Sequence, residues 1–309
     1  MNDTCEEILA RITIRAAGKI NLFLDVLGKR GDGYHDIVTV MQEIDLHDTI
    51  TISEQGTRGI YLMPGPGKKN KLPCLETGPK NLACRAAKLF MEGSGIKKGI
   101  SIRLEKRIPA GAGLGGGSSD AAAVLKGLNK LWKAGFSDSD LAKMGARIGM
   151  DVPFFIRGGT ALATGRGDVV TPVLSRARFW VILVDPGFSF STRSAYESLD
   201  RRNLPAKGFS RVKIVLDCLR TGNVGRLADN LYNIFEKAVD MKYKGYIKGV
   251  KEMLETTGAA GTLMTGSGSV VYGIYNERGE AQRAYRIAGK RAGSAHLAAT
   301  RGGLRNGDN

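Results

Sequence analysis

The sequence lacks the features that would place it in several specialised classes of protein. No apolar run in its 309 residues approaches the roughly 20 residues of a membrane-spanning helix. The first seven residues are acidic and polar, unlike a secretory signal peptide. The cysteines are few and lack the CxxC spacing of a disulfide framework or zinc site: Cys5, Cys74, Cys84 and Cys218. We therefore expect a cytoplasmic protein with reduced thiols.

Acidic residues are also in short supply, because 46 lysines and arginines stand against 30 aspartates and glutamates. The formal net charge of +16 would suit a nucleic-acid binder, a protein of acidic membrane surfaces, or an enzyme for highly anionic small molecules. The basic residues are spread over most of the chain and form no dense block with interleaved aromatic residues. Charge alone therefore selects none of these classes. The 42% hydrophobic content is ordinary for a globular protein, and the length fits two domains or one large domain.

Glycine, by contrast, is concentrated in the stretch Pro109–Asp120, where five of the seven residues from 111 to 117 are glycine. The missing side chains let backbone N–H groups approach a ligand closely. An apolar pattern typical of one helix face follows, at Val124, Leu125, Leu128, Leu131 and Trp132. Ser118, Ser119 or Asp120 would cap this helix. Free N–H groups and the positive end of a helix dipole both favour phosphate, so the stretch is typical of a polyphosphate-binding loop.

Four alternative interpretations of this stretch can be compared with the sequence. The spacing Gly111-x-Gly113-x-x-Gly116 fits a dinucleotide-binding fingerprint, but a predicted helix start at 136–141 stands where an acidic strand end is expected. A Walker loop ends in Gly-Lys-Ser/Thr, whereas this stretch ends in Gly-Ser-Ser. A protein-kinase loop would need Val-Ala-Ile-Lys and His-Arg-Asp motifs, which the sequence lacks. A flexible linker, finally, has no reason to adjoin a well-patterned amphipathic helix.

Five polar or aromatic residues elsewhere are candidates for a functional site. Lys19 and Asn21 fall on one face of a predicted strand whose other face is apolar. Tyr34 and His35 follow a glycine-rich turn and supply a ring that can stack on a base and nitrogens that can donate or accept. Asp151 follows a predicted helix and precedes an apolar segment, where a carboxylate can act as a general base or phosphate-site ligand. Each also has an ordinary explanation: a surface lysine, a hairpin with an aromatic anchor, or a turn aspartate.

Hydrophobic periodicity predicts a mixture of helices and strands with no internal repeat. Strands are predicted at 11–15, 16–27, 37–52, 99–106, 179–184 and 270–275, with a hairpin at 157–168. Helices are predicted at 81–91, 121–132, 141–148, 210–219, 227–243 and 247–256, with loops at 56–78 and 262–269. Ser137–Asp140 resembles a capping box. A change of pattern near Thr171 indicates the start of a second domain.

The order of the motifs along the chain is more specific than any one of them. The segment Ala17-Gly18-Lys19-Ile20-Asn21, the stretch Pro109–Ser119 and the late turn Thr265–Gly268 resemble the three motifs of the GHMP kinases. The elements Asp-Gly-Tyr34-His35 and Gly-Gly-Gly-Ser-Ser are the most diagnostic, because other branches of this superfamily usually lack them. The resemblance runs from about Arg11 to about Leu297, which is nearly the whole chain.

This resemblance implies an α+β fold with the two-domain GHMP kinase architecture. A ribosomal S5 domain 2-like ATP-binding domain would cover 1–170, a ferredoxin-like domain 171–300, and a flexible tail 301–309. The implied reaction transfers the γ-phosphoryl group of ATP to the 2-hydroxyl of a cytidine-diphosphate-linked methylerythritol, in the non-mevalonate route to isoprenoid precursors. ATP and Mg²⁺ are the implied cofactors, without nucleic-acid or membrane partners, and the protein would be a monomer or weak homodimer.

Two alternatives remain open at this point. One is a GHMP kinase for another small alcohol, mevalonate-like or a sugar. The other is a non-catalytic protein that binds a nucleotide or nucleic acid through its positive charge.

The resemblance also implies a role for particular residues. Asp151 would accept the proton of the attacking hydroxyl, and Lys19 would hold Asp151 and that hydroxyl in place. The nucleotide would contact Asn81, Leu82, Lys106, Pro109, Ala110, Gly111, Ala112, Gly113, Leu114, Gly115, Gly116, Gly117, Ser118 and Ser119, with Ser119 as a contact of the metal. The phosphate acceptor would contact Asn21, Tyr34, His35, Thr192 and Tyr196. In this arrangement Tyr34 and Tyr196 enclose the cytosine ring, and His35 binds its edge.

Overall fold

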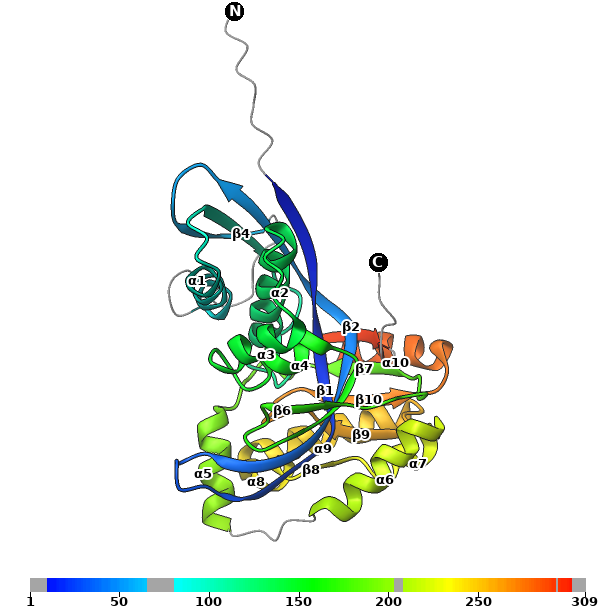
Figure 1. Cartoon of the computed structure of the whole chain (residues 1–309). Helices are drawn as coiled ribbons and strands as arrows, with labels where there is room; N and C mark the ends of the chain where they lie inside the picture. Colours follow the sequence, from blue (N-terminus) through cyan, green and yellow to red (C-terminus); the bar gives the residue numbers. More distant parts are fainter. Residues whose placement is uncertain (1–9, 66–80, 203–207, 293, 302–309) are drawn as a thin grey trace, which may run out of the picture. The chain divides into compact units, whose positions relative to one another are not determined.

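The computed structural model of the chain describes residues 10–65, 81–202, 208–292 and 294–301 (Figure 1). The predicted loop at 56–78 is therefore described only in part. The tail predicted at 301–309 lies outside the described residues apart from Arg301.

The chain divides into two compact units, which are described separately. Unit 1 comprises the residues up to 16, 48–107 and 117–156, and unit 2 comprises 17–47, 108–116 and the residues from 157 onward. Two long strands, β1 (Arg11–Lys29) and β2 (His35–Gln55), contribute to both units. These units therefore cut the chain differently from the predicted boundary at 170, and that boundary stays a prediction.

Unit 1 combines a sheet with helices. β3 (Ile60–Pro64) pairs parallel with β4 (Gly99–Glu105), which pairs antiparallel with the last residues of β2. The helices are α1 (Leu82–Ser94), α2 (Gly116–Leu131), α3 (Asp138–Ala146) and α4 (Val152–Arg157). α2 lies so close to the strands that a Cβ on Gly127 would be 2.3 Å from Ile14 Cδ1 and 2.8 Å from Ile52 Cδ1. This packing supports the helix that directly follows the glycine-rich loop.

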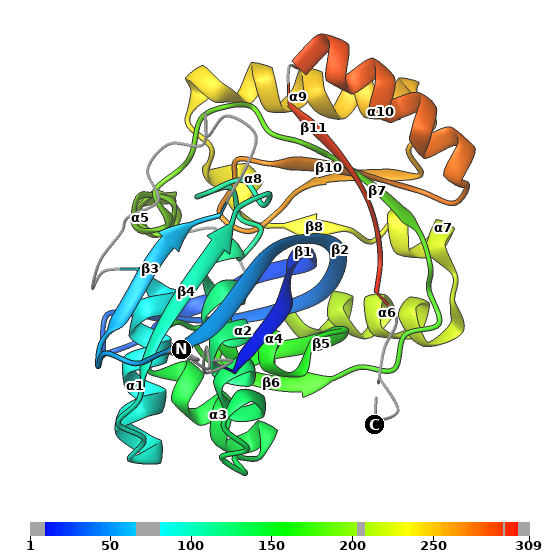
Figure 2. The same ribbon diagram turned by 90° about the horizontal axis from the view of Figure 1, so that it is seen from above.

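Unit 2 contains a four-stranded antiparallel sheet in the order β11-β7-β10-β9. Its strands are β7 (Trp180–Val184), β9 (Gly261–Met264), β10 (Val271–Tyr275) and β11 (Ala295–Ala299). The helices α9 (Met241–Thr256) and α10 (Arg278–Ala292) lie side by side and contact the sheet (Figure 2). A β-α-β-β-α-β order with the first and last strands adjacent is the ferredoxin-like arrangement. The predicted fold of this part of the chain is therefore confirmed.

The remaining elements of unit 2 share one apolar core with this sheet. β5 (Thr160–Thr164) forms the predicted hairpin with β6 (Val169–Pro172) and also pairs with β2. The short strand β8 (Tyr232–Asn233) pairs parallel with β1. The helices are α5 (Thr192–Arg202), α6 (Gly208–Thr221), α7 (Val224–Ala228) and α8 (Phe235–Ala238).

Three predicted elements are wrong. The loop predicted at 262–269 begins inside β9, because its residues 262–264 pair with β10. The helix predicted at 227–243 is replaced by parts of α7, β8, α8 and α9, because Tyr232 and Asn233 pair with β1 and interrupt the helical pattern. The loop predicted at 56–78 contains β3, whose apolar residues Ile60 and Leu62 align with Ile100 and Ile102 of β4.

The capping interactions give one confirmation and one correction. The predicted capping box is confirmed at α3, where Ser137 and Asp140 each accept a hydrogen bond from the other's backbone N–H. The predicted cap of α2 is wrong, because this helix begins at Gly116 and places Ser118, Ser119 and Asp120 inside the helix.

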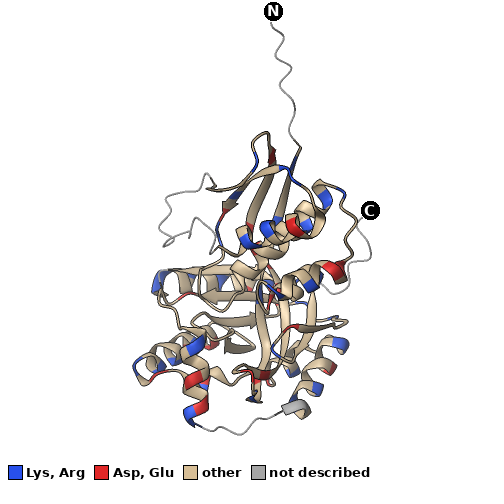
Figure 3. Cartoon of the chain, turned by 60° about the vertical axis from the view of Figure 1, so that its left-hand side comes forward, with Lys and Arg blue, Asp and Glu red and all other residues tan. Residues whose placement is uncertain are grey.

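The surface features agree with an ordinary globular chain. Lys and Arg residues are spread over helices and strands of both units, with Asp and Glu residues among them (Figure 3). Across the described residues, no helix combines the length and the apolar character that crossing a membrane would require. Cys218 is a free, buried thiol.

Candidate functional site

The glycine-rich stretch forms a loop that ends where α2 begins. Gly111, Gly113 and Gly115 adopt φ angles of +64°, +79° and +70°. Residues with a Cβ rarely adopt these angles, so the loop conformation depends on glycine at these positions. Repeated left-handed glycines turn successive N–H groups inward, which is the geometry of an anion-binding concavity.

Gly113 also brings the loop against the third motif. A Cβ on Gly113 would lie 2.2 Å from the carbonyl oxygen of Thr265, much closer than atoms approach in folded proteins. The first motif is joined to the same loop, because the N–H of Lys19 donates to the carbonyl of Leu114 at 3.1 Å. Three segments that are far apart in the sequence therefore meet within unit 2, as their resemblance to one family's motifs predicts.

Asn21 joins the first of these segments to the third. It is 3% exposed. Its Oδ1 accepts hydrogen bonds from Lys19 Nζ at 2.6 Å and from the N–H of Gly266 at 3.0 Å. Its own N–H donates to Thr265 Oγ1 at 3.1 Å, and its Nδ2 donates to Thr39 Oγ1 at 2.8 Å. These bonds give Asn21 a structural role, and its predicted contact with the phosphate acceptor stays a prediction.

Sequence analysis missed two residues that hold the third motif. Asn233 donates from Nδ2 to the carbonyls of Met264 at 2.6 Å and Gly266 at 2.8 Å. Tyr272 donates from its hydroxyl to the carbonyl of Asn21 at 2.8 Å. Complete burial raises the pKa of the Tyr272 hydroxyl well above its ordinary value, so it remains a donor. One indication of this role was available in the sequence. Asn233 lies inside a predicted helix, and an asparagine side chain competes with the helix for backbone hydrogen bonds.

The two predicted catalytic residues belong to different units. Lys19 lies on β1 in unit 2 and is 4% exposed. Asp151 lies in unit 1, half-buried, directly before α4. Its carbonyl accepts from the N–H of Phe155 at 3.4 Å. The joint action of Lys19 and Asp151 stays a prediction.

Two of the residues predicted to bind the phosphate acceptor form a cluster with an unexpected third residue. The rings of His35 and Tyr196 stack at a centroid distance of 4.6 Å and an angle of 23°. Nε2 of His35 forms a hydrogen bond with Asp200 Oδ1 at 2.7 Å. Bonds from Lys29 and His35 lower the pKa of Asp200. The anionic carboxylate therefore fixes the orientation of the imidazole and leaves Nδ1 as its other polar atom.

Tyr34 and Thr192 lie in the same unit but outside this stack. Tyr34 is 51% exposed, and the guanidinium of Arg166 lies 5.2 Å from its ring centroid. Thr192 begins α5, and its hydroxyl forms a hydrogen bond with Ser267 Oγ at 3.0 Å. That bond ties the start of α5 to the turn of the third motif.

The residues predicted to border the adenine lie in unit 1. Asn81 is the N-cap of α1 and accepts from the N–H of Ala83 at 2.9 Å. Leu82 approaches the first turn of α2, because a Cβ on Gly117 would lie 3.5 Å from Leu82 Cδ1. The start of α1 and the start of α2 are therefore neighbours, as a shared nucleotide site requires.

Lys106 forms a buried charge cluster with two carboxylates that the sequence did not indicate. Its Nζ donates to Asp48 and, at 2.7 Å, to Asp120 Oδ2. The side chains of Lys106, Asp48 and Asp120 are 12%, 0% and 5% exposed. Burial and the neighbouring Asp48 raise the pKa of Asp120 from 3.8 to about 7, although Lys106 opposes this shift. The cluster fixes the lysine beside Asp120 of α2.

The fit of Mg²⁺ to this chain can be judged from its donor groups. Within the ranges that the structure describes, no cluster of three or more His, Cys, Asp and Glu residues could hold a metal ion. Ser119 is 2% exposed, whereas Ser118 is half-buried at the same helix start. Mg²⁺ in phosphoryl-transfer enzymes is held largely by phosphate oxygens and water, so a site with few protein ligands still fits this ion.

Comparison with known proteins assigns the class. Residues 81–159 match the GHMP kinases N terminal domain, and residues 215–295 match the GHMP kinases C terminal domain. The chain belongs to the GHMP kinase family. A homoserine kinase from Cytophaga hutchinsonii has the same fold with a TM-score of 0.72 at 17% identity, and it covers 99% of this chain and 98% of its own.

More similar relatives share one name. The 4-diphosphocytidyl-2-C-methyl-D-erythritol kinase of Alkaliphilus metalliredigens is 38% identical over 277 residues, which are 90% of this chain and 92% of the relative. The kinase of the same name from Caldicellulosiruptor saccharolyticus is 41% identical over 271 residues, which are 88% and 90% of the two chains. A crystal structure of 4-(cytidine 5'-diphospho)-2C-methyl-D-erythritol kinase gives a TM-score of 0.79 at 32% identity, covering 94% of this chain and all of the other.

Gly113→Ala should destabilise the protein far more than an ordinary glycine substitution. The left-handed backbone costs a residue with a Cβ about 1–2 kcal/mol, and the overlap with Thr265 adds about 1–3 kcal/mol. Gly187→Ala is the matched control, because Gly187 has a φ of +77° but a Cβ added there would have no atom within 4 Å. Urea unfolding measures both variants. Equal losses would show that the loop does not need the close approach.

Asp120→Asn should change how stability depends on pH. The folded protein holds a proton on Asp120 that the unfolded chain releases between about pH 4 and pH 7. The stabilisation of the folded state by this proton on Asp120 is therefore present at low pH and is lost as the pH rises through about 7. Asn carries no such proton, so the variant should gain stability relative to wild type between about pH 4 and pH 7, by an amount on the order of 1 kcal/mol per pH unit. Urea unfolding across this range measures the difference, and parallel curves would contradict the prediction. Asp138→Asn, on the exposed first turn of α3, is the control.

Proposed function

We propose that this protein transfers the γ-phosphoryl group of ATP to the 2-hydroxyl of 4-diphosphocytidyl-2-C-methyl-D-erythritol. The observation that carries this proposal is the meeting of the three family motifs around Lys19, Asn21 and Thr265, in a chain about 40% identical to kinases of that name. The His35 cluster supports the choice of a cytidine-bearing acceptor. The reaction would supply a phosphorylated intermediate in the non-mevalonate route to isoprenoid precursors.

The proposed phosphoryl transfer needs a base for the attacking hydroxyl and positive charge around the phosphates, and it needs no covalent intermediate with the enzyme. Asp151 accepts the proton of the attacking hydroxyl, which makes that oxygen nucleophilic as it approaches the γ-phosphorus. Lys19 orients the hydroxyl and keeps the carboxylate ionised. The bond from Lys19 Nζ to Asn21 supports this role, because it holds the ammonium in one direction.

The loop and the start of α2 bind the phosphates in this proposal. Backbone N–H groups from Gly111 to Ser119 donate to phosphate oxygens, and the dipole of α2 adds positive potential. Mg²⁺ would neutralise charge on the transferring group, with Ser119 or the more accessible Ser118 near it. Asn81, Leu82 and Lys106 border the adenine.

The acceptor end is assigned to unit 2. Nδ1 of His35 binds the cytosine edge while Asp200 holds the opposite nitrogen. Tyr34 offers an exposed ring for stacking on the base. Tyr196 stacks on the imidazole of His35 and holds it in place. Thr192 continues the site at the start of α5. We also propose that the enzyme acts in the cytoplasm as a monomer or weak homodimer, without nucleic-acid partners.

Asp151→Asn should lower kcat by about 10²–10⁴-fold, because the shape is kept while the general base is lost. An assay of ADP release measures this with Mg²⁺-ATP and a panel of alcohols: the cytidine-linked methylerythritol, mevalonate, homoserine and galactose. Only the first should support turnover in the wild type. Asp138→Asn should retain wild-type activity. Equal activity with mevalonate or galactose, or an unaffected Asp151→Asn variant, would overturn the proposal.

His35→Ala and Tyr34→Ala should raise the KM for the cytidine-linked alcohol at least about tenfold, because each removes a contact to the base. The KM for ATP should stay unchanged. His47→Ala is the control, because His47 binds only the nearby carbonyl of Asp45 in the observed hydrogen bonds. A kinase for another alcohol would show little change in any of the three variants.

A further inference from the structure

Helix α5 presents two different faces. Thr192, Tyr196 and Asp200 recur every four residues and form one face, which carries the contacts to Ser267 and His35. Ser194 and Arg201 lie on another face, where a separate cavity opens in unit 2. Thr192, Tyr196 and Asp200 therefore lie outside the lining of this second space.

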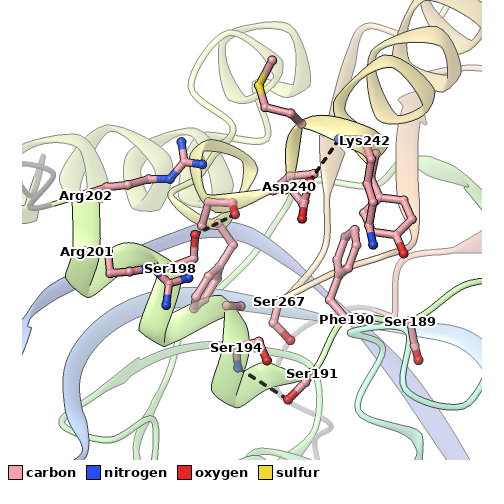
Figure 4. A pocket seen from close by; sticks show the side chains of 16 residues that line it. Ser189, Phe190, Ser191, Ser194, Ser198, Arg201, Arg202, Asp240, Lys242 and Ser267 are labelled. Carbon is pink, nitrogen blue, oxygen red and sulfur yellow. Dashed lines mark hydrogen bonds between the residues drawn. The ribbon is translucent and has the colours of Figure 1, made fainter.

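This cavity, here named the α5 cavity, has a volume of about 510 Å³. That volume falls in the range of small-molecule sites, roughly 300–1,000 Å³. Its walls come from α5, the segment before it, α8 and the start of α9 (Figure 4). Figure 4 shows Arg201 and Arg202 at one end, Phe190 and Lys242 at the other, and Ser267 between them.

The charged groups of the α5 cavity favour an anion. Arg201, Arg202 and Lys242 line it, against a single carboxylate from Asp240. That carboxylate is already engaged, because it caps α9 by accepting from the N–H of Lys242 at 3.1 Å. In the part of the chain that the structure describes, neither guanidinium forms an ion pair. Guanidinium groups are well suited to phosphate oxygens.

The remainder of the lining combines five serines with apolar and aromatic residues. Phe190 and Tyr243 meet edge to face at 5.2 Å, and the buried residues Phe235 and Val239 continue this surface. Such a surface favours a compact apolar or aromatic group. A ligand that satisfies both ends would carry a phosphate and a small apolar moiety.

We propose that the α5 cavity is a binding site for a small phosphate ester, distinct from the sites for ATP and the phosphate acceptor. The phosphate binds Arg201 and Arg202, and the apolar group lies on Phe190 and Tyr243. Because Ser267 lines the cavity and also bonds Thr192, an occupied cavity contacts both the third motif and the start of α5. The proposal does not rest on the identity of the phosphate acceptor.

The test is calorimetric titration of the full chain with phenyl phosphate, which combines both chemical features. Inorganic phosphate and phenol, titrated separately, should each bind more weakly than phenyl phosphate. The double variant Arg201→Ala/Arg202→Ala should weaken phenyl phosphate at least about tenfold, because it removes charge-assisted hydrogen bonds. Ser194→Trp, which fills the cavity and keeps both arginines, should weaken it as well. Thermal melts confirm that the variants remain folded.

Arg193→Ala is the matched control, because Arg193 is an exposed arginine of α5 outside the cavity lining, and it should bind the probe like wild type. Saturating ATP should leave the binding unchanged. The proposal is overturned by no binding at millimolar phenyl phosphate, by equal binding in all variants, or by competition from ATP, which would place the probe on the glycine-rich loop. None of these readings requires catalytic turnover, so the result is independent of the proposed reaction.

Discussion

The observed arrangement of the motifs depends on one constraint: the buried side-chain amide of Asn21 needs hydrogen-bond partners. A buried amide that lacks partners costs free energy, so its bonds define which segments must meet. Asn21 accepts hydrogen bonds from Lys19 on its own strand and from Gly266 of the third motif. Its Nδ2 donates a hydrogen bond to Thr39. The turn can approach this closely only because glycine faces glycine, since a Cβ on Gly266 would lie 2.9 Å from Gly113 Cα. Hydrogen bonding thus selects the partners, and missing side chains make their approach possible.

Buried charge is the second constraint, and it acts within unit 1. Lys106 is held between Asp48 and Asp120, so three ionisable groups share one desolvated space. Two carboxylates near one ammonium carry an excess of negative charge, and burial then favours a proton on Asp120. Among the described residues, the buried Oδ1 of Asp120 has no hydrogen-bond partner, which agrees with a carboxyl group that is not fully ionised. Such a cluster fixes the positions of its side chains but adds little to the stability of the fold. The cost of removing the charged groups from water offsets much of the attraction between them.

Local rules predicted the parts of this structure that depend on neighbouring residues. The capping box at Ser137 was predictable because its partner lies three residues away, and the glycine-rich loop because only glycine tolerates its backbone angles. The role of Asn233 was not predictable, since its partners Met264 and Gly266 are about 30 residues distant and its strand has two residues. Likewise, no local pattern pairs His35 with Asp200, 165 positions apart. Long-range polar contacts of single side chains leave no periodic trace in a sequence.

The separation of these features explains how one fold can serve different alcohols. A mevalonate kinase from L. major shares the fold with a TM-score of 0.72 at only 15% identity, so the similarity of fold does not itself identify an acceptor. In this chain the His35 cluster depends on α5 and Lys29, whereas the Asn21 network depends on β1, β10 and the two glycine turns. Tyr34 and His35 can therefore change without disturbing the bonds of the Asn21 network, whereas Thr192 is bonded to Ser267 of the third motif. Selection for a new acceptor would act on Tyr34, His35 and α5, while Gly113, Asn21 and Gly266 would stay fixed by packing.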